Sequence, residues 1–259
     1  MSKKQNNKKE FADGSFRKLS SHPTTFSSGC QLDEEQKEAK RLALENTVMF
    51  LTGKPGTSKT FLATQIALDA VISKQYSKVI ISRPTVETGE SQQMGFLPGD
   101  AFDFKEGKMA PYIKPVLQQM YKLKDKKTID MMFEKGMIEI QPLQFIRGLN
   151  FEDVIVVVDE GQNATVEELK AITTRICSDA KVIITSDYNQ IDLRNKNKSL
   201  ANFVDAISKL KGVGIFNLTK NYRHPLALEI LDLVNEMQDN ERKAVYDSSR
   251  KEEETSVNQ

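Results

Sequence analysis

Short apolar runs alternate with amphipathic segments along the middle of the chain. Runs such as Val48–Leu51, Lys78–Ser82 and Val154–Val158 are short, show no helical stripe and predict buried strands. Apolar residues at helical spacing predict helices between them. The expected helices cover residues 32–45, 59–73, 112–121, 128–134, 165–176, 199–210 and 226–237, and the other expected strands cover 137–140, 181–185 and 214–218. Such alternation predicts an α/β fold with a mostly parallel sheet and helices on both faces.

Composition fits one globular domain flanked by polar tails. The chain has 259 residues, of which 39% are apolar and 28% charged, enough for a core of its own. We expect that domain at residues 31–237. The basic, polar residues 1–30 and the polar residues 238–259 are predicted to be disordered. The basic tail is either a solubilising segment or an aid in holding RNA or DNA.

Charge, cysteine content and apolar run length limit the partners and the compartment that we expect. A net charge of +1 gives no global attraction to polyanions, so a nucleic-acid site would have to be a local patch. Cys30 and Cys177 form no disulfide framework, and no metal-ligand cluster accompanies them, which indicates a reducing cytoplasm. No apolar run approaches the roughly 18 residues needed to cross a bilayer, so we expect no membrane partner.

The segment from Thr47 to Thr60 reads T-V-M-F-L-T-G-K-P-G-T-S-K-T and has the order strand, turn, helix. Glycines in such a turn let successive N–H groups point inward at a phosphate, and the helix N-terminus adds a favourable dipole. Lys59 can reach the β- and γ-phosphates of a nucleotide, and the Thr60 hydroxyl can ligate Mg²⁺. The predicted phosphate loop consists of Gly53, Lys54, Pro55, Gly56, Thr57, Ser58, Lys59 and Thr60.

Ser58 departs from the pattern G-x-x-x-x-G-K-[ST], since it stands where the second glycine belongs. A left-handed backbone at this residue would cost ~1–2 kcal/mol of strain, whereas a helical backbone would cost little. We expect the helical conformation. The alternative for the whole segment is a Gly/Ser/Thr turn that matches by chance.

Two carboxylates, Asp159 and Glu160, follow the apolar run Val154–Val158. Parallel sheets bind ligands at the carboxyl ends of their strands, which is where this pair is expected. The first acid can hold Mg²⁺ and the second can polarise an attacking water, as phosphoanhydride hydrolysis requires. The alternative is an ordinary acidic turn between a strand and a helix.

Two further polar residues follow later strands. Gln190 comes just past the strand at residues 181–185 and is predicted to sense the γ-phosphate, although S-D-Y-N-Q also suits a plain turn. Arg223 follows the last strand and can stabilise charge on a transferring phosphoryl group, in cis or from a neighbour. A surface ion pair is the alternative for Arg223.

Several sequence blocks follow one another along the chain: G-K-P-G-T-S-K-T, R-P-T-V-E-T-G-E, G-F-L-P-G-D, I-E-I-Q-P-L-Q-F-I-R-G, V-V-D-E-G-Q-N, I-T-S-D-Y-N-Q-I-D and N-Y-R-H-P. In this order they resemble the PhoH family of phosphate-starvation-type ATPases, which is similar to the first motor domain of superfamily 1 helicases. The resemblance covers roughly Gln36 to Met237. It implies a RecA-like P-loop NTPase fold, ATP and Mg²⁺ as ligands, and hydrolysis of ATP.

The resemblance also implies roles for residues outside the central motifs. Gln36 would contact adenine through its amide, with an exposed helical glutamine as the alternative. Arg83, Glu87 and Glu90 would line a nucleic-acid path or couple it to ATP, and Arg147 would touch a phosphate backbone; ion pairs within the domain explain these charges equally well. Departures from the family pattern are Ser58 and Ser186 in place of glycine and Gly161 in place of alanine.

Superfamily 1 motors bind ATP between two such domains, and this chain has length for one. The resemblance therefore implies a homo-oligomer, a ring of six subunits in which Arg223 completes a neighbouring site. Single-stranded RNA is the expected nucleic-acid partner. Two alternatives stay open: a weakly hydrolysing, nucleotide-dependent assembly switch, and a small-molecule phosphotransferase.

Overall fold

The computed structural model describes residues 31–84, 110–143, 146, 150–187, 200–234, 236 and 237. The chain divides after Lys220 into two units, each of which is described by itself. The predicted tails at 1–30 and 238–259 lie outside the described residues, as do Glu87, Glu90, Arg147 and Gln190.

Six parallel strands form one sheet in the described part of the chain, in the order β3-β2-β4-β5-β1-β6. The three central strands β4, β5 and β1 are buried along their whole length, whereas β3 and β6 at the edges are partly exposed. This explains why the central strands are continuous apolar runs. The strands are β1 (Val48–Gly53), β2 (Lys78–Ser82), β3 (Ile138–Ile140), β4 (Val154–Val158), β5 (Lys181–Ser186) and β6 (Val213–Leu218).

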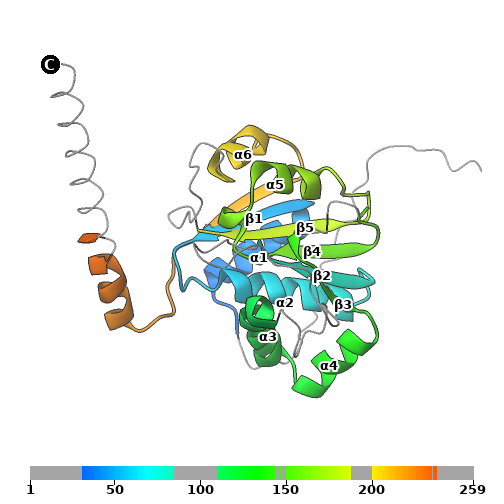
Figure 1. Cartoon of the computed structure of the whole chain (residues 1–259), viewed down its shortest axis with the longest axis horizontal. Helices are drawn as coiled ribbons and strands as arrows, with labels where there is room; N and C mark the ends of the chain where they lie inside the picture. Colours follow the sequence, from blue (N-terminus) through cyan, green and yellow to red (C-terminus); the bar gives the residue numbers. More distant parts are fainter. Residues whose placement is uncertain are drawn as a thin grey trace, which may run out of the picture. The chain divides into compact units, whose positions relative to one another are not determined.

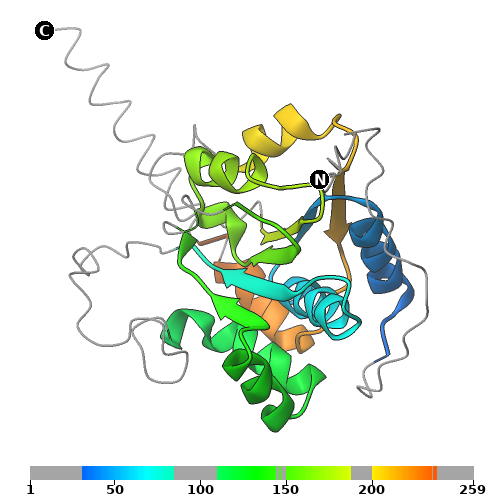
Figure 2. The same cartoon turned by 90° about the vertical axis from the view of Figure 1, so that its right-hand side faces the viewer.

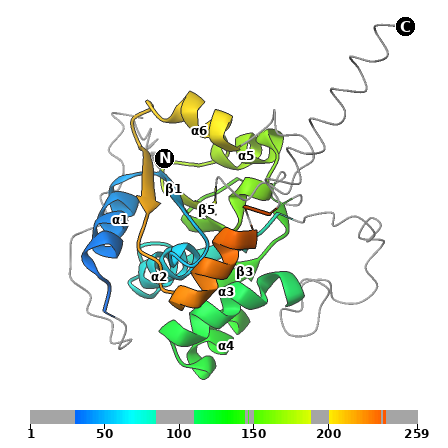
Figure 3. The ribbon, with the colours of Figure 1, turned by 90° about the vertical axis from the view of Figure 1, so that its left-hand side faces the viewer.

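Helices cover both faces of the sheet, as Figures 1, 2 and 3 show from three sides. One face packs against α1 (Glu34–Glu45), α2 (Lys59–Ile72), α3 (Ala110–Leu123) and α4 (Lys126–Glu134). The other packs against α5 (Val166–Thr173) and α6 (Leu200–Ile207). Neighbouring strand residues point to opposite faces, so Met49 joins the first core and Phe50 the second. The predicted α/β fold is confirmed.

The hydrophobic pattern located these elements to within about three residues at their ends. Thr165 caps α5 as predicted, in a reciprocal capping box with Glu168. That helix ends at Thr173 rather than at the predicted Ile176, because Ile176 forms a parallel bridge with Phe151 and must be extended.

Because all six strands run in the same direction, their carboxyl ends meet at one edge of the sheet. The phosphate loop follows β1, Arg83 follows β2, Asp159 follows β4 and Asp187 follows β5. Thr219 follows β6 at the same edge. Polar and charged residues from distant parts of the sequence therefore lie at the same edge of the sheet.

In the second unit, residues 225–234, 236 and 237 are helical, which confirms the helix predicted at 226–237 in its described part. Among the described residues of the whole chain, no helix combines the length and apolar character that a bilayer crossing requires.

Candidate functional site

The predicted phosphate loop connects the end of β1 to the start of α2. Gly53 has a φ of 146°, and a Cβ at this residue would lie 2.4 Å from the backbone oxygen of Leu218. Gly56 has a φ of 90°. Both glycines therefore occupy backbone conformations that other residues rarely adopt, and Gly53 also allows the close approach of β6.

Ser58 is the N-cap of α2 and has φ 66° and ψ 19°, in the left-handed region. The expectation of a helical backbone at this residue is wrong. The loop still makes the turn that glycine would allow, so the Ser58 Cβ costs ~1–2 kcal/mol. Its side chain forms no cap bond to α2 and instead accepts a hydrogen bond from Gln36 Nε2 at 2.8 Å.

Lys59 turns its side chain back across the loop. The ammonium donates to the backbone oxygen of Gly53 at 2.7 Å and to that of Lys54 at 2.9 Å. The Thr57 hydroxyl donates to the same Lys54 oxygen at 2.9 Å and tightens the turn. The loop therefore holds a positive charge at the N-terminus of α2, where the helix dipole also favours an anion.

Asp159 contacts the phosphate loop directly. Its Oδ1 accepts from the Thr60 hydroxyl at 2.7 Å, although the two residues are 99 positions apart. The Thr185 hydroxyl, from β5, donates to the same oxygen at 2.7 Å. Asp159 is 1% exposed, so these bonds offset the cost of burying its charge. The lysine–threonine loop and the acid pair therefore share one site.

Glu160 has φ 57°, a strained backbone for a residue with a side chain. Its Oε2 accepts a hydrogen bond from Gln162 Nε2 at 2.5 Å, and the amide oxygen of Gln162 accepts one from the backbone N–H of Asp187 at 3.1 Å. The Thr185 hydroxyl accepts from the backbone N–H of Glu160 at 3.3 Å. Gln162 thus links the carboxylate to the residue that follows β5, and Thr185 links the Glu160 backbone to β5 itself.

Arg83 lies beside both acids. Its guanidinium is 3.9 Å from Asp159 Oδ2 and 3.6 Å from Glu160 Oε1. Of the two explanations that the sequence left open for Arg83, the structure shows ion pairing within the domain. Gln162 and Thr185 were not singled out from the sequence, because the bond between Gln162 and Asp187 and both bonds of Thr185 to the acid pair depend on which strands are neighbours.

The donors at this edge suit Mg²⁺. Among the residues that the structure describes, no three acidic, histidine or cysteine side chains gather as a closed metal cage. Mg²⁺ does not require one, since it is often held by one or two carboxylates together with substrate phosphates. The Thr60 hydroxyl and the Asp159 carboxylate, 2.7 Å apart, are oxygen donors of the required kind.

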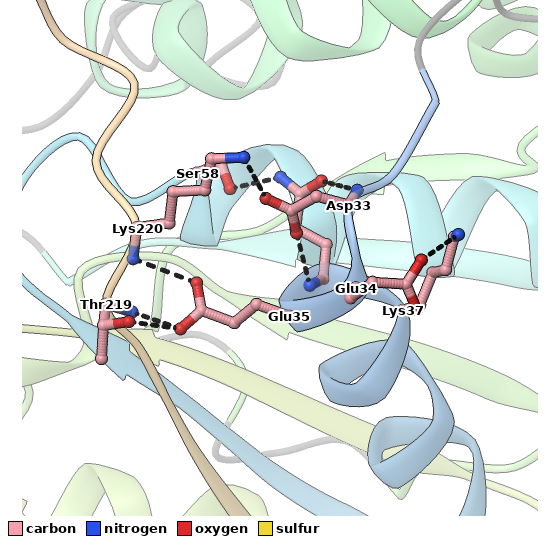
Figure 4. Close-up of polar contacts among 8 residues, drawn as sticks. Asp33, Glu34, Glu35, Lys37, Ser58, Thr219 and Lys220 are labelled. Carbon is pink, nitrogen blue, oxygen red and sulfur yellow. Dashed lines mark hydrogen bonds and ion pairs between the residues drawn. The ribbon is translucent and has the colours of Figure 1, made fainter.

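The first turn of α1 lies next to the loop (Figure 4). Gln36 is 5% exposed, so the alternative of an exposed helical glutamine is wrong, while its contact with adenine stays a prediction. Glu35 accepts hydrogen bonds from Thr219 and from the backbone N–H of Lys220. Partial burial raises the pKa of Glu35, but these bonds outweigh it and leave the pKa below its ordinary value.

Two predicted site residues are not brought to this edge by the described contacts. Gln190 lies outside the described residues. Arg223 belongs to the second unit, where its backbone N–H donates to the side chain of Asn221 at 2.9 Å. Their roles as phosphate sensor and arginine finger stay predictions.

A parallel sheet that places a lysine–threonine loop against an acid pair defines a P-loop NTPase of the RecA-like class. The chain belongs to the PhoH-like family: the family profile described as "PhoH-like protein" matches residues 31–235. A PhoH-like protein of Mycobacterium tuberculosis (strain ATCC 25618 / H37Rv) is 38% identical over 190 residues, which cover 72% of this chain and 52% of that protein.

Two other relatives match over similar shares of this chain. A PhoH-like protein of Bacillus subtilis (strain 168) is 37% identical over 76% of this chain and 61% of its own length. Protein PhoH of Escherichia coli (strain K12) is 32% identical over 67% of this chain and 48% of its own length. The matched region therefore spans about half to three fifths of these relatives. Among solved structures, Pif1 helicase from Candida albicans matches with 16% identity and a TM-score of 0.42, over 80% of this chain and 43% of that one.

Proposed function

We propose that this protein binds ATP together with Mg²⁺ and hydrolyses the ATP to ADP and phosphate. The observation that carries the proposal is the 2.7 Å hydrogen bond from Thr60 to Asp159. It joins the helix N-terminus that would hold the phosphates to the strand end that carries the acids. Hydrolysis of a phosphoanhydride needs both parts in one place.

The loop would hold the phosphates through its N–H groups and through Lys59, whose ammonium now donates to loop carbonyls. A triphosphate offers stronger, charge-assisted acceptors for that ammonium than neutral carbonyls do. Thr60 and Asp159 would hold Mg²⁺, which when bound neutralises charge on the phosphates. The contacts that fix these two side chains in the structure already point them at each other.

Glu160 would accept the proton of the attacking water. The role needs a carboxylate held in one orientation, since proton transfer depends on hydrogen-bond geometry. Gln162 donates to one carboxylate oxygen of Glu160, and the Arg83 guanidinium lies 3.6 Å from the other. These two contacts support Glu160 as a positioned base.

Phosphate release from ATP, with Lys59→Ala and Glu160→Gln compared with wild type, tests the activity. We expect Lys59→Ala to lose nucleotide binding, because the loop loses its cation. Glu160→Gln should retain bound ATP but hydrolyse it at least about 100-fold more slowly, because the amide cannot take a proton. Glu167→Gln, an exposed change on α5, is the matched control and should be unaffected. Normal turnover by Glu160→Gln would contradict the assigned role.

We further propose that ATP turnover is coupled to single-stranded RNA and that the active form is a homo-oligomer, with six subunits in a ring. Support comes from the order of the sequence motifs, and the described P-loop domain provides one wall of a motor-type site. In this arrangement Gln190 would sense the γ-phosphate, and Arg223 would act on a neighbouring subunit.

Turnover with and without single-stranded RNA separates the candidate functions. Stimulation favours a motor, no stimulation favours an assembly switch, and consumption of a small hydroxyl compound as phosphate acceptor favours a phosphotransferase. For the ring, mass measurement with nucleotide should give a closed oligomer. Arg223→Ala should be inactive alone and active in mixtures whose sites receive an intact Arg223; no recovery in mixtures would contradict action in trans.

A further inference from the structure

Ser58 carries a side chain at a backbone conformation that favours glycine, and a residue of another helix holds that side chain. The φ of Ser58 is 66°, and its hydroxyl accepts a hydrogen bond at 2.8 Å from Nε2 of Gln36, 22 residues earlier. A left-handed conformation persists at a non-glycine residue only where the surroundings enforce it. Among the described contacts, the bond from Gln36 is the one that holds the Ser58 side chain in this turn.

Gln36 is itself fixed at the start of α1. Its amide oxygen accepts from the backbone N–H of Asp33 at 3.1 Å, and its own N–H donates to Asp33 Oδ1 at 2.9 Å. Figure 4 shows how this turn is also attached to the end of β6: Lys220 pairs with Asp33 at 2.9 Å, and Thr219 donates to Glu35. Gln36 therefore contacts the loop from the start of α1, which is itself held to the end of β6.

We propose that Gln36 is a positioning residue of the phosphate loop, which holds the Ser58 hydroxyl and so maintains the left-handed turn at the start of α2. The turn directs Lys59, the next residue, and the N–H groups of the loop. Any ligand with a triphosphate should depend on this contact, whatever its base. The inference rests on the proposed nucleotide-binding function and assigns to Gln36 a role other than contact with adenine.

The hydrogen bonds of the Gln36 amide favour this role. A glutamine that recognises adenine uses its amide oxygen and its amide nitrogen together, in a bidentate contact. In the structure both groups already have partners, Asp33 for the oxygen and Ser58 for the nitrogen. Contact with adenine would be left with the second amide hydrogen and the second lone pair of the oxygen, in the directions that these two bonds leave open.

Two substitutions at Ser58 distinguish the effect of losing the hydroxyl from the effect of the backbone strain. Ser58→Ala removes the hydroxyl but keeps the Cβ, so the strained turn loses its support. Ser58→Gly removes both, so the turn needs no support. We expect Ser58→Ala to bind ATP, GTP and inorganic triphosphate about three- to tenfold more weakly than wild type, the usual effect of losing one hydrogen bond. Ser58→Gly should bind all three at least about threefold more tightly than Ser58→Ala does.

Gln36→Ala should weaken binding of all three ligands by the same factor. In a protein that already carries Ser58→Gly, adding Gln36→Ala should weaken binding by less than about twofold. Glu34→Ala is the matched control, because Glu34 lies in the same helical turn and pairs with exposed Lys37, away from the loop. Weaker binding of ATP alone in Gln36→Ala would show contact with adenine and would overturn the proposal, as would a Ser58→Ala protein that binds like wild type.

Hydrogen exchange of the loop amides in the nucleotide-free protein supplies a readout that does not depend on ligand binding. Exchange at residues 54 and 56–58 should be about three- to tenfold faster in Gln36→Ala than in Glu34→Ala, because the loop opens more often once the bond from Gln36 is lost. If wild type binds no triphosphate, the proposed function fails, and the exchange rates still decide whether Gln36 holds the loop. Equal rates in the two variants would overturn the positioning role.

Discussion

Replacing Thr185 by valine removes a hydroxyl that joins β5 to both acids while it keeps the shape of the side chain. That hydroxyl donates to Asp159 Oδ1 at 2.7 Å and accepts from the backbone N–H of Glu160 at 3.3 Å. Thr185 and Asp159 are each 1% exposed, so water cannot readily replace the lost partner. We expect Thr185→Val to damage both stability and turnover.

The size of the effect follows from the two hydrogen bonds. A bond to a buried carboxylate contributes ~1.5–3 kcal/mol, and the longer bond from the Glu160 N–H adds roughly 0.5 kcal/mol. Asp159 retains the bond from Thr60, which limits the loss. The free energy of unfolding should therefore fall by about 2–3 kcal/mol. Turnover should fall by about 10- to 100-fold, because a misplaced catalytic group loses much of its effect.

Urea denaturation gives the free energy of unfolding, and phosphate release gives kcat and KM. Thr185→Ser is the matched control, because it keeps the hydroxyl and loses one methyl group; its turnover should stay within about threefold of wild type. A Thr185→Val protein with the stability and kcat of wild type would refute the view that this hydroxyl positions the acid pair.

Two further substitutions test the charges of Lys181 and Arg83. Lys181 donates to the backbone oxygens of Ala43 and Asn46, and burial lowers its pKa from 10.5 to about 8. Between these two pH values the unfolded chain binds more protons than the folded chain, so the stability of wild type should rise with pH relative to that of Lys181→Met. Urea denaturation should show a gain of about 2 kcal/mol in the free energy of unfolding from about pH 7.5 to about pH 10. No gain would contradict the burial effect. Arg83→Ala removes the cation beside both acids, so half-maximal turnover should need about threefold less Mg²⁺, with a lower kcat. Arg83→Lys should keep the wild-type requirement, and an unchanged or higher requirement in Arg83→Ala would argue against charge competition.

Local patterns were enough to predict the elements and the two central motifs. Val154–Val158 is apolar on both faces and ends in Asp159, so both the strand and the position of the acid follow from adjacent residues. Thr185 could not be predicted in the same way. It meets Asp159 because β4 and β5 are neighbours in a register that pairs Val158 with Ile184, and strand order depends on the whole fold.

Gly161 shows how a local departure can have a distant cause. The family pattern, as the resemblance implied it, has alanine at this residue. A Cβ on Gly161 would lie 2.5 Å from Ile184 Cγ2 and 3.2 Å from the backbone oxygen of Thr185. Ile184 is a fully buried residue of β5 with little room to move. The departure at Gly161 is visible in the sequence, but only the packing of the 3₁₀ turn against β5 explains it.

The site contains two strained residues, Ser58 and Glu160, and each is held by a glutamine. Left-handed backbone costs ~1–2 kcal/mol at a non-glycine residue, and a neutral hydrogen bond contributes ~0.5–1.5 kcal/mol, so strain and support nearly cancel. Neither conformation would persist from local preference alone. Because Gln36 lies on α1 and Gln162 bonds to the backbone of Asp187, the two strained turns depend on packing that is remote in sequence. Loss of either glutamine should therefore alter ligand binding or turnover before it unfolds the sheet.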